Sequence, residues 1–496
     1  MNPRLTNHSD EARTVGAVAV IGGGIAGMQA SLDLADAGFR VHLIERSGGI
    51  GGRMAQLDKT FPTNDCAMCT ISPRLVDCDK HPNIDIITNA ELLSADGDPG
   101  DLRLSVHRRA TYVDADKCNA CGDCEVACPV HLPDEFNEAL GPRSVIHKLY
   151  PQTIPNVYTI DKAAPPPCTL TCPAGVNVQG YVALISEGKL KEAVSLIRER
   201  HPLPSACGRI CYHPCEHACN RKDLDEPVAV NALKRFAADS ERERRRVDGD
   251  GPGHPAKAAP TGRKVAVVGS GPAGLTAAYD LALDGHKVAI FEAAPVAGGM
   301  LRMGIPDYRL PKGGLQEEID DLLSIGIDLW LDTPIGPNLT LDDLKGQGYD
   351  ATFLAVGAQK SLRLDIPGVE LDGVMHGVEF LRAVSLEEPA PIGRTVAVVG
   401  GGDVAMDVAQ TALRLGAEKV MVLYRRTEQE MPAHAEERIS AEEEGIEFHY
   451  LIAPTGVVGD GAMTGVMCQS MRLGEPDDSG RRRPEPIEGS EAVIEA

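Results

Sequence analysis

The chain has 496 residues, which is long enough for about three or four domains. Its net charge of -23 argues against nucleic-acid binding, because contacts to phosphates need patches of Lys and Arg. No apolar run reaches the roughly 18–20 residues of a membrane helix. Residues 1–16 lack the apolar segment of a signal peptide. We therefore expect a cytoplasmic protein with no membrane span.

Residues 16–46 predict an apolar strand, a glycine turn, a helix and a second apolar strand. The turn carries G-x-G-x-x-G as Gly22, Gly24 and Gly27. The first glycine allows a tight turn, the second lets the backbone approach a pyrophosphate, and the third lets helix and strand pack closely. Glu45 ends the second strand, where a carboxylate accepts ribose hydroxyls and repels a 2′-phosphate. The pattern predicts an FAD or NAD site, although glycines kept only for packing would look the same.

Thirteen of the 14 cysteines lie between Cys66 and Cys219, mostly at short spacings that favour metal ligation over disulfides. The run "CNACGDCEVACP" has the spacing of a 4Fe–4S cluster, with ligands Cys118, Cys121, Cys124 and Cys128. Bacterial ferredoxins often repeat this run and exchange the fourth cysteine between two clusters, but no second run is present. We expect Cys128 to close its own cluster. The alternative is that it completes an upstream set formed by Cys66, Cys69 and Cys78.

A third group of six cysteines follows: Cys168, Cys172, Cys207, Cys211, Cys215 and Cys219. Pro214 interrupts any continuous helix through the last four, so loops around an inorganic cluster are the favoured interpretation. Six thiolates serve one cluster and leave two over. A zinc site is the alternative, because zinc also accepts four thiolates. Cys468 stands alone and is expected to be an ordinary thiol.

The strand–turn–helix pattern recurs twice after a Gly- and Pro-rich linker at residues 246–262. The second copy, at 264–293, carries Gly269, Gly271, Gly274 and the strand-end Glu292, and again predicts FAD or NAD. The third copy, at 395–426, carries Gly400, Gly402 and Ala405, and its strand ends in Arg425 and Arg426. Guanidinium groups there favour the 2′-phosphate of NADP, although two solvated arginines beside an NAD site remain possible. Three such copies predict an α/β fold of doubly wound FAD- and NAD(P)-binding Rossmann-type domains with inserted ferredoxin-like and helical iron–sulfur domains.

The segment "GGGIAGMQASLDLADAGFRVHLIERSGGIGGRMAQLDKTFPTNDCAMC", with "YVDADKCNACGDCEVACPV" after it, resembles the A subunit of heterodisulfide reductase over roughly residues 15–162. The resemblance implies a portion that binds FAD and iron–sulfur clusters and passes electrons among partner subunits, in some members by flavin-based bifurcation. Gly52 and Arg53 fall in this segment and are assigned to cofactor binding with it.

From about Pro165 the chain resembles the small subunit of glutamate synthase, together with the relatives of that subunit, on "CGRICYHPCEHAC", "GGMLRMGIPDYRLPK" and "GGGDVAMDVAQTALRLGAEKVMVLYRRTEQEMPAH". This implies FAD on the second turn, where Gly299 joins the binding residues, and NADPH on the third. Two departures argue for one cluster where relatives hold two. A CxxC pair before Cys168 is missing, and Lys234 stands where some relatives have a Gln or acidic ligand. The family's closing strand and Gly-Asp turn do not appear, so we expect a truncated chain.

The domain boundaries expected from these patterns follow the chain in order: 1–105 FAD module with Cys66, Cys69 and Cys78; 106–140 ferredoxin-like segment; 141–165 linker; 166–245 helical iron–sulfur domain; 246–262 linker; 263–378 incomplete FAD domain; 379–496 truncated NAD(P) domain.

The predicted function is that of an oxidoreductase subunit that moves electrons between NAD(P)H, up to two FAD, two or three 4Fe–4S clusters and a partner subunit or ferredoxin. One alternative is a true small subunit of glutamate synthase. The other is a non-catalytic assembly subunit with degenerate flavin sites. No acid–base catalytic residue can be nominated from the sequence.

Overall fold

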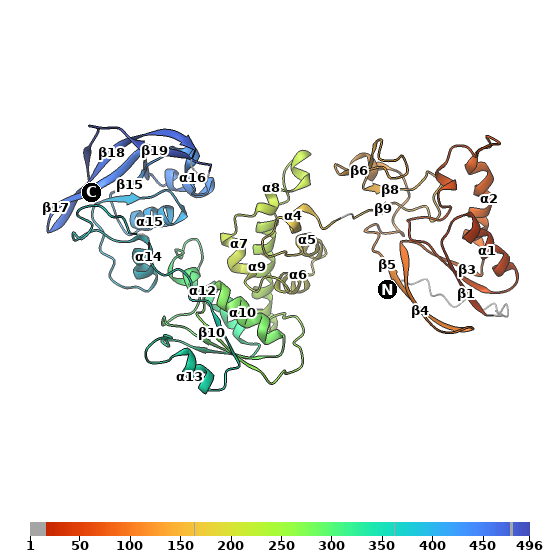
Figure 1. Ribbon diagram of the computed structural model, residues 1–496, viewed down its shortest axis with the longest axis horizontal. Helices are drawn as coiled ribbons and strands as arrows, with labels where there is room; N and C mark the ends of the chain where they lie inside the picture. The colour runs from red at the N-terminus through yellow and green to blue at the C-terminus, as the bar shows by residue number, and fades with distance from the viewer. Residues whose placement is uncertain (1–15, 163, 362, 477–479) are drawn as a thin grey trace. The chain divides into compact units, whose positions relative to one another are not determined.

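The computed structural model describes residues 16–162, 164–361, 363–476 and 480–496. The chain divides into two compact units, Met1–Pro165 with Asn220–Pro227 and Pro166–Cys219 with Val228–Ala496 (Figure 1). No helix within the described ranges is both long enough and apolar enough to cross a membrane.

The N-terminal unit is built on a parallel sheet of three strands in the order β1-β2-β3. Its strands and main helices are β1 (Ala17–Ile21), α1 (Ile25–Asp36), β2 (Arg40–Ile44), α2 (Ala67–Lys80) and β3 (Ile84–Ile87). Val18 pairs with Val41, which pairs with Ile84, so the β-branched apolar residues of the strands align across the sheet. Met28 on α1 and Ile71 on α2 are fully buried against it. The apolar faces of both helices therefore form the core of this module.

The rest of this unit consists of short elements that extend from the module. They are η1 (Met54–Gln56), the hairpin β4 (Ala90–Asp98) and β5 (Asp101–Arg108), α3 (Asp123–Val126), β6 (His131–Pro133), β7 (Pro142–Ser144), β8 (Ile146–His147) and β9 (Thr159–Ile160). The predicted linker at 141–165 is not a free connection. Tyr150 is buried, its hydroxyl donates to the carbonyl of Ile50, and Ile50 N donates to Ile154 O. The chain returns here to pack on the loop that follows β2, a long-range contact with no local sequence signal.

The second unit begins with a helical domain. Its helices are α4 (Pro167–Leu170), α5 (Val178–Ser186), α6 (Leu190–Arg198), α7 (Pro204–Ile210), α8 (Pro214–His217) and α9 (Val230–Asp248), with η2 (Asn220–Asp223) in the segment assigned to the other unit. Pro204 and Pro214 each occupy a first helical position, where the missing N–H costs nothing. The long helix α9 packs against α5, α6 and α7 (Figure 1). It ends at Gly249, whose φ of 73° suits a glycine C-cap, so the start of the predicted linker at 246–262 is helical.

Two further parallel sheets follow. The first, in the order β12-β11-β10-β13, contains β10 (Lys264–Val268), β11 (Lys287–Phe291), β12 (Ile327–Trp330) and β13 (Ala351–Leu354). Its helices are α10 (Pro272–Leu283), α11 (Met300–Met303), α12 (Lys312–Leu323) and α13 (Leu341–Gly346). Tyr279 on α10 and Ile319 on α12 are fully buried in the same core as Ile290 of β11. The two helices therefore cover one face of this sheet together.

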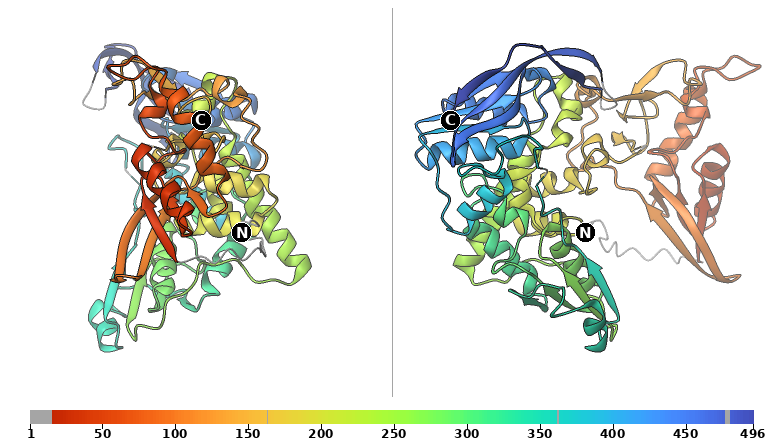
Figure 2. Two further views of the ribbon diagram at one scale, coloured as in Figure 1. Left: turned by 90° about the vertical axis from the view of Figure 1, so that its right-hand side faces the viewer. Right: turned by 60° about the vertical axis from the view of Figure 1, so that its left-hand side comes forward.

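The second of these sheets, in the order β14-β15-β16, contains β14 (Thr395–Val399), β15 (Lys419–Tyr424) and β16 (Glu447–Tyr450). Its helices are α14 (Gly377–Ser385), α15 (Asp403–Arg414), η3 (Glu428–Glu430) and α16 (Ala435–Glu443). An antiparallel sheet of β17 (Ile452–Asp460), β18 (Ala462–Pro476), β19 (Arg482–Pro486) and β20 (Ala492–Glu495) packs beside β15 (Figure 2). Val466 and Cys468 of β18 share a buried cluster with Leu423, so Cys468 is a core thiol.

Candidate functional site

The first glycine turn follows β1 and leads into α1. Gly22 has φ 100°, and a Cβ on Gly27 would lie 1.8 Å from the carbonyl oxygen of Gly22. Neither position accepts another residue, for conformational and steric reasons respectively. A Cβ on Gly24 would meet no protein atom within 4 Å. The protein itself therefore leaves space over Gly24 at the positive end of α1, where a pyrophosphate fits.

The second turn, between β10 and α10, repeats this geometry. Gly269 has φ 101°, and a Cβ on Gly274 would lie 1.9 Å from the carbonyl oxygen of Gly269. A Cβ on Gly271 would find only the Cα of Gly299, at 4.0 Å. The space over Gly271 at the N-terminus of α10 therefore corresponds to the space over Gly24.

One further glycine lies close to each of these two turns, in the loop that follows the second strand of the motif. Gly52 has φ 58° and Gly299 has φ 55°. A Cβ on Gly52 would lie 3.2 Å from Gly24 Cα, and one on Gly299 would lie 2.7 Å from Gly271 Cα. Each loop thus approaches its turn at the glycine left open for a ligand. Arg53 directly follows Gly52 and is exposed.

The two strand-end glutamates are buried, and each holds its own turn in place. Glu45 accepts hydrogen bonds from Gly23 N at 2.6 Å and Ser47 N at 2.8 Å. Glu292 accepts them from Ser270 N at 2.7 Å and Ala294 N at 2.8 Å. The sequence pointed to a contact with ribose but missed this backbone role. Both carboxylates lie beside the open glycines, so the residues present fit a dinucleotide at each turn.

The third turn has Ala405 in place of a third glycine, and the two arginines after its second strand differ in exposure. Gly400 has φ 137°, a Cβ on Gly402 would meet nothing within 4 Å, and Ala405 is buried at the start of α15. Arg426 is 5% exposed and donates from Nε to the carbonyl oxygen of Arg482 at 2.7 Å. Arg425 is exposed. The structure therefore separates the predicted pair and leaves Arg425 as the guanidinium directed to solvent.

The ferredoxin-like run folds as a set of tight turns around a single turn of helix, α3. Ala120 at φ 58° and Gly122 at φ 99° reverse the backbone between the cysteines. Burial, and then the charges of Cys121 and Cys118, raise the pKa of the Cys124 thiol, which places these three sulfurs in one electrostatic neighbourhood. Cys128 donates to Val130 O at 3.4 Å. The first three cysteines are brought together, and Cys128 follows them within four residues.

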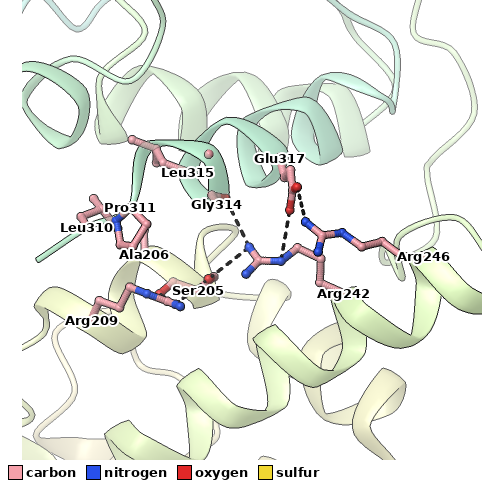
Figure 3. A pocket seen from close by; sticks show the side chains of 11 residues that line it. Ser205, Ala206, Arg209, Arg242, Arg246, Leu310, Pro311, Gly314, Leu315 and Glu317 are labelled. Carbon is pink, nitrogen blue, oxygen red and sulfur yellow. Dashed lines mark hydrogen bonds and ion pairs between the residues drawn. The ribbon is translucent and has the colours of Figure 1, made fainter. Parts of the chain in front are cut away.

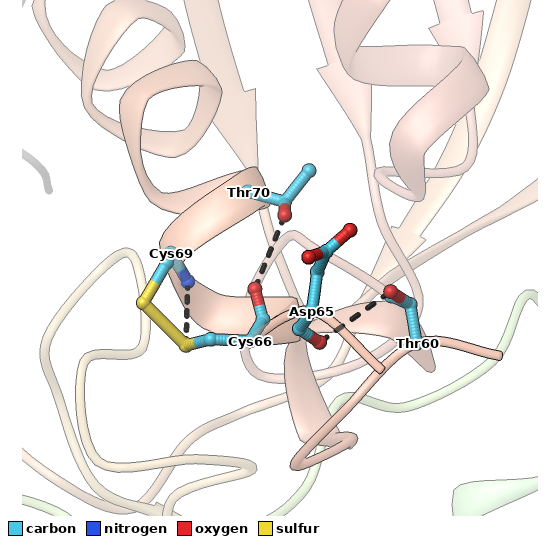
Figure 4. Close-up of a disulfide and its surroundings, with 5 residues drawn as sticks. All are labelled: Thr60, Asp65, Cys66, Cys69 and Thr70. Carbon is cyan, nitrogen blue, oxygen red and sulfur yellow. Dashed lines mark hydrogen bonds between the residues drawn. A yellow bond between two sulfur atoms is a disulfide. The ribbon is translucent and has the colours of Figure 1, made fainter. Parts of the chain in front are cut away.

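Cys66, Cys69 and Cys78 are not brought together. Cys66 and Cys69 are exposed at the start of α2, where they form a disulfide (Figure 4). Cys78 is nine residues further along the same helix, a rise of about 13 Å, and is fully buried. Its thiol donates to the carbonyl oxygen of Met28 at 3.7 Å. An intact α2 therefore does not offer these three thiols to one cluster, because the helix separates them.

Four of the six cysteines of the helical domain lie close enough to one buried tyrosine, Tyr181, to act on its hydroxyl, and the other two act on members of that four. Burial, and then the charges of Cys215, Cys168, Cys172 and Cys207, raise the pKa of its hydroxyl. Cys219 likewise acts on Cys168, and Cys211 on Cys207. In the described part of the chain no three Cys, His, Asp or Glu side chains converge as they would around a single metal ion.

Cys207 lies between another thiol and a lysine. The Cys211 thiol donates to it, burial opposes the effect, and the ammonium of Lys234 lies 3.0 Å from its sulfur. Together these influences lower the pKa of Cys207 to about 6. A lowered pKa favours the thiolate of Cys207, the form that binds iron. The sequence identified Lys234 as a residue unable to ligate but could not show which cysteine it touches.

The helical domain also touches the third turn through Tyr212, which directly follows Cys211. Its ring stacks on His434 with ring centroids 3.3 Å apart, and its hydroxyl donates to Asp403 at 2.8 Å. Asp403 opens α15 directly after Gly402. Next to this contact Arg309 donates to Asp407 at 2.7 Å. Sequence reasoning missed this junction because its parts are far apart in the chain.

A cavity of about 230 Å³ lies between α7, α9 and α12 (Figure 3). Arg242 on α9 donates to Gly314 O and pairs with Glu317, and Arg246 also pairs with Glu317. Arg209 pairs with Asp239 at 2.7 Å. Each arginine that lines the cavity thus has a carboxylate partner, and the network ties the helical domain to α12.

Four families match parts of the chain. Residues 263–475 match pyridine nucleotide-disulphide oxidoreductase, and 162–246 match dihydropyrimidine dehydrogenase domain II with its 4Fe-4S cluster. Residues 20–84 match an NAD(P)-binding Rossmann-like domain, and 111–133 match a 4Fe-4S binding domain.

Three similar proteins place these parts in context. The chain is 47% identical over 348 residues to the NADP(+)-dependent formate dehydrogenase subunit beta of Moorella thermoacetica, over 66% of this chain and 49% of that protein. It is 45% identical over 336 residues to the NADPH-Fe(3+) oxidoreductase subunit beta of Geobacter sulfurreducens, with the same two shares. It is 36% identical over 347 residues to the glutamate synthase [NADPH] small chain of Escherichia coli, over 67% of this chain and 72% of that protein. The chain belongs to the glutamate synthase small chain family.

The chain spans about half the length of the first two of these relatives. The matched families confirm the predicted fold class and the cofactor classes FAD, NADP(H) and 4Fe–4S. The predicted resemblance to the small subunit of glutamate synthase is also confirmed. The individual ligands and the number of clusters stay predictions.

Proposed function

We propose that the chain is an iron–sulfur flavoprotein subunit that oxidises NADPH and delivers single electrons to a partner protein. The observation that carries the proposal is the repetition of one turn geometry, open over Gly24 and again over Gly271, within a chain that also gathers two groups of cysteines. FAD, when bound, supplies the conversion between hydride transfer and single-electron transfer, and 4Fe–4S clusters carry single electrons.

Each residue set would contribute position and electrostatics. The N-terminus of α10 would receive the pyrophosphate of FAD, while Glu292 fixes the turn that presents it. Arg425 would bind the 2′-phosphate of NADPH beyond the turn at Gly400 and Gly402. The cysteines around Tyr181 would hold a cluster in the domain that contacts this nucleotide turn through Tyr212.

The first module would then be a second flavin site on the way to the partner. Its turn over Gly24 and its neighbouring ferredoxin-like run support this role, and the run would hold the cluster that receives or donates single electrons. The resemblance of this portion to heterodisulfide reductase supports a partner of that complex type, or a ferredoxin, as the acceptor. The cysteines of the ferredoxin-like run and of the helical domain are free thiols, which supports a reducing compartment such as the cytoplasm, although Cys66 and Cys69 form a disulfide.

Anaerobic purification followed by flavin, iron and sulfide analysis tests the proposal. We expect bound FAD, iron and sulfide, and bleaching of the flavin absorbance on addition of NADPH. A protein that binds neither flavin nor iron would contradict it and would support the alternative of a non-catalytic assembly role.

The second candidate is a true glutamate synthase small chain, supported by the match over 72% of the Escherichia coli protein. The additional N-terminal module with its own glycine turn favours the first candidate, because feeding a synthase partner does not require a second flavin site. Electron delivery to the large subunit of glutamate synthase, measured with glutamine and 2-oxoglutarate, would decide for the second.

A further inference from the structure

Lys234 is a buried cation in direct contact with a cluster cysteine. Lys234 lies on α9 and is 8% exposed, and its Nζ donates to Cys207 Sγ at 3.0 Å. Throughout the described residues no carboxylate lies within ion-pair distance of this ammonium. On α9 itself, Asp239, Glu241 and Glu243 each pair with an arginine. The charge that Lys234 faces is therefore the thiolate.

A lysine in this position cannot ligate iron while it is protonated, because the ammonium has no lone pair. Its effect must be electrostatic. When a cluster accepts one electron, no bond to cysteine forms or breaks, and the assembly of iron, sulfide and thiolates becomes more negative by one unit. A buried positive charge stabilises the more negative state, and it does so more strongly away from water than at the surface. Hydrogen bonds to the sulfurs act in the same direction.

We propose that Lys234 sets the reduction potential of the cluster held by the cysteines around Tyr181, through its hydrogen bond to the Cys207 thiolate. The inference rests on the proposed function in one respect, that these cysteines bind a cluster. Lys234 is a positioning and tuning residue that makes this cluster easier to reduce. It would thereby hold the electron in the domain next to the nucleotide turn.

Redox titration followed by electron paramagnetic resonance tests the inference on the full chain. The signal of this cluster is first identified as the one lost in Cys172→Ala. Lys234→Gln and Lys234→Met remove the charge, and Lys234→Arg keeps it. Arg235→Gln is the matched control, because it removes one positive charge from the next residue, which is exposed and pairs with Asp239.

We expect both neutral variants to keep their iron and sulfide but to lose at least about tenfold in the equilibrium constant for reduction, which is ~59 mV for one electron. Lys234→Arg and Arg235→Gln should stay near the wild-type potential. An unchanged potential in Lys234→Gln at full iron content would overturn the inference. Loss of iron from all three Lys234 variants, with helix content retained, would also overturn it by assigning Lys234 to cluster assembly. Wild-type protein that lacks iron and sulfide at this site would instead contradict the proposed function itself.

Discussion

Arg425 and Arg426 are neighbours in sequence but occupy opposite environments at the end of β15. Arg426 is buried and donates to a backbone carbonyl of the C-terminal sheet, whereas Arg425 is exposed. We therefore expect Arg425→Gln to weaken the binding of NADPH about 10- to 100-fold and that of NADH far less, because a charge-assisted contact is worth roughly 1.5–3 kcal/mol. Dissociation constants for both nucleotides measure this difference.

Arg394→Gln is the control for Arg425→Gln. Arg394 is an exposed arginine of the same domain and pairs with Glu418. It should leave the preference for NADPH intact. Equal losses of NADPH and NADH affinity in Arg425→Gln would contradict the assignment.

Lys312 has a buried ammonium group, so its effect on stability should depend on pH. Burial lowers its pKa from 10.5 to about 8, although its Nζ donates to Leu301 O and Ile305 O. The folded state therefore binds fewer protons than the unfolded state between these two pH values, and wild-type stability should rise with pH across that window. Across this window the free energy of unfolding of the wild type should rise by about 1–3 kcal/mol relative to that of Lys312→Met, since one pKa unit corresponds to about 1.4 kcal/mol.

Urea denaturation followed by the fluorescence of Trp330 provides the measurement for Lys312. Trp330 is the single tryptophan and lies on β12 of the same domain. Lys345→Met, at an exposed lysine on α13, should show no such change with pH. A constant difference between wild type and Lys312→Met from pH 7.5 to pH 10 would show that the ammonium is not destabilised by burial.

At the scale of elements, the strands and helices that carry glycine turns were predictable, because local apolar periodicity and turn residues specify them. The structure of the segment at 141–165 was not predictable, because its contacts are distant in sequence. Buried Tyr150 contacts a residue about a hundred positions earlier, and buried Tyr158 contacts the ferredoxin-like run. The sequence also showed no sign that the structure would keep Cys66, Cys69 and Cys78 apart. Spacing alone does not reveal that α2 runs uninterrupted from Ala67 to Lys80, with Pro73 inside it.

The ferredoxin-like segment leads to a prediction about Cys128. Cys118, Cys121 and Cys124 already share one neighbourhood, and Cys128 follows on the same short turn of chain. We expect Cys128→Ala and Cys121→Ala to abolish the same paramagnetic signal of the reduced protein. Cys66→Ala should leave that signal unchanged, because Cys66 pairs with Cys69 at the start of α2. If Cys128→Ala instead abolishes a signal that also depends on Cys66, the fourth ligand crosses between clusters.

At the scale of the whole chain, one construction serves three sites. Each site has a strand, a glycine turn with an open second glycine, and a helix whose N-terminus faces the opening. The turn residues were predictable because the motif is local. The contacts between the sites were not predictable, because Tyr212 contacts the third turn across 191 residues of sequence. Assignment of a ligand to each turn therefore needs a change that affects one turn at a time.

Alanine at each open glycine provides such a change. Gly24, Gly271 and Gly402 all have extended backbone with negative φ, and a Cβ at each would meet no close protein atom. The variants should therefore fold, while the new methyl group occupies the place of the ligand pyrophosphate. We expect Gly24→Ala and Gly271→Ala each to lower the flavin content, and Gly402→Ala to keep the wild-type flavin content but bind NADPH on the order of tenfold more weakly, a cost of about 1.4 kcal/mol.

Flavin released per chain and NADPH-dependent bleaching distinguish the three variants. Gly271→Ala should lose rapid bleaching by NADPH together with its flavin, whereas Gly24→Ala should keep it, because the NADP-type turn belongs to the same matched oxidoreductase domain as Gly271. Gly313→Ala, on α12 with open space around its Cβ position, is the control and should behave as wild type. Full flavin content in Gly24→Ala would mean that the first turn binds no FAD. The N-terminal module would then act through its cysteines alone.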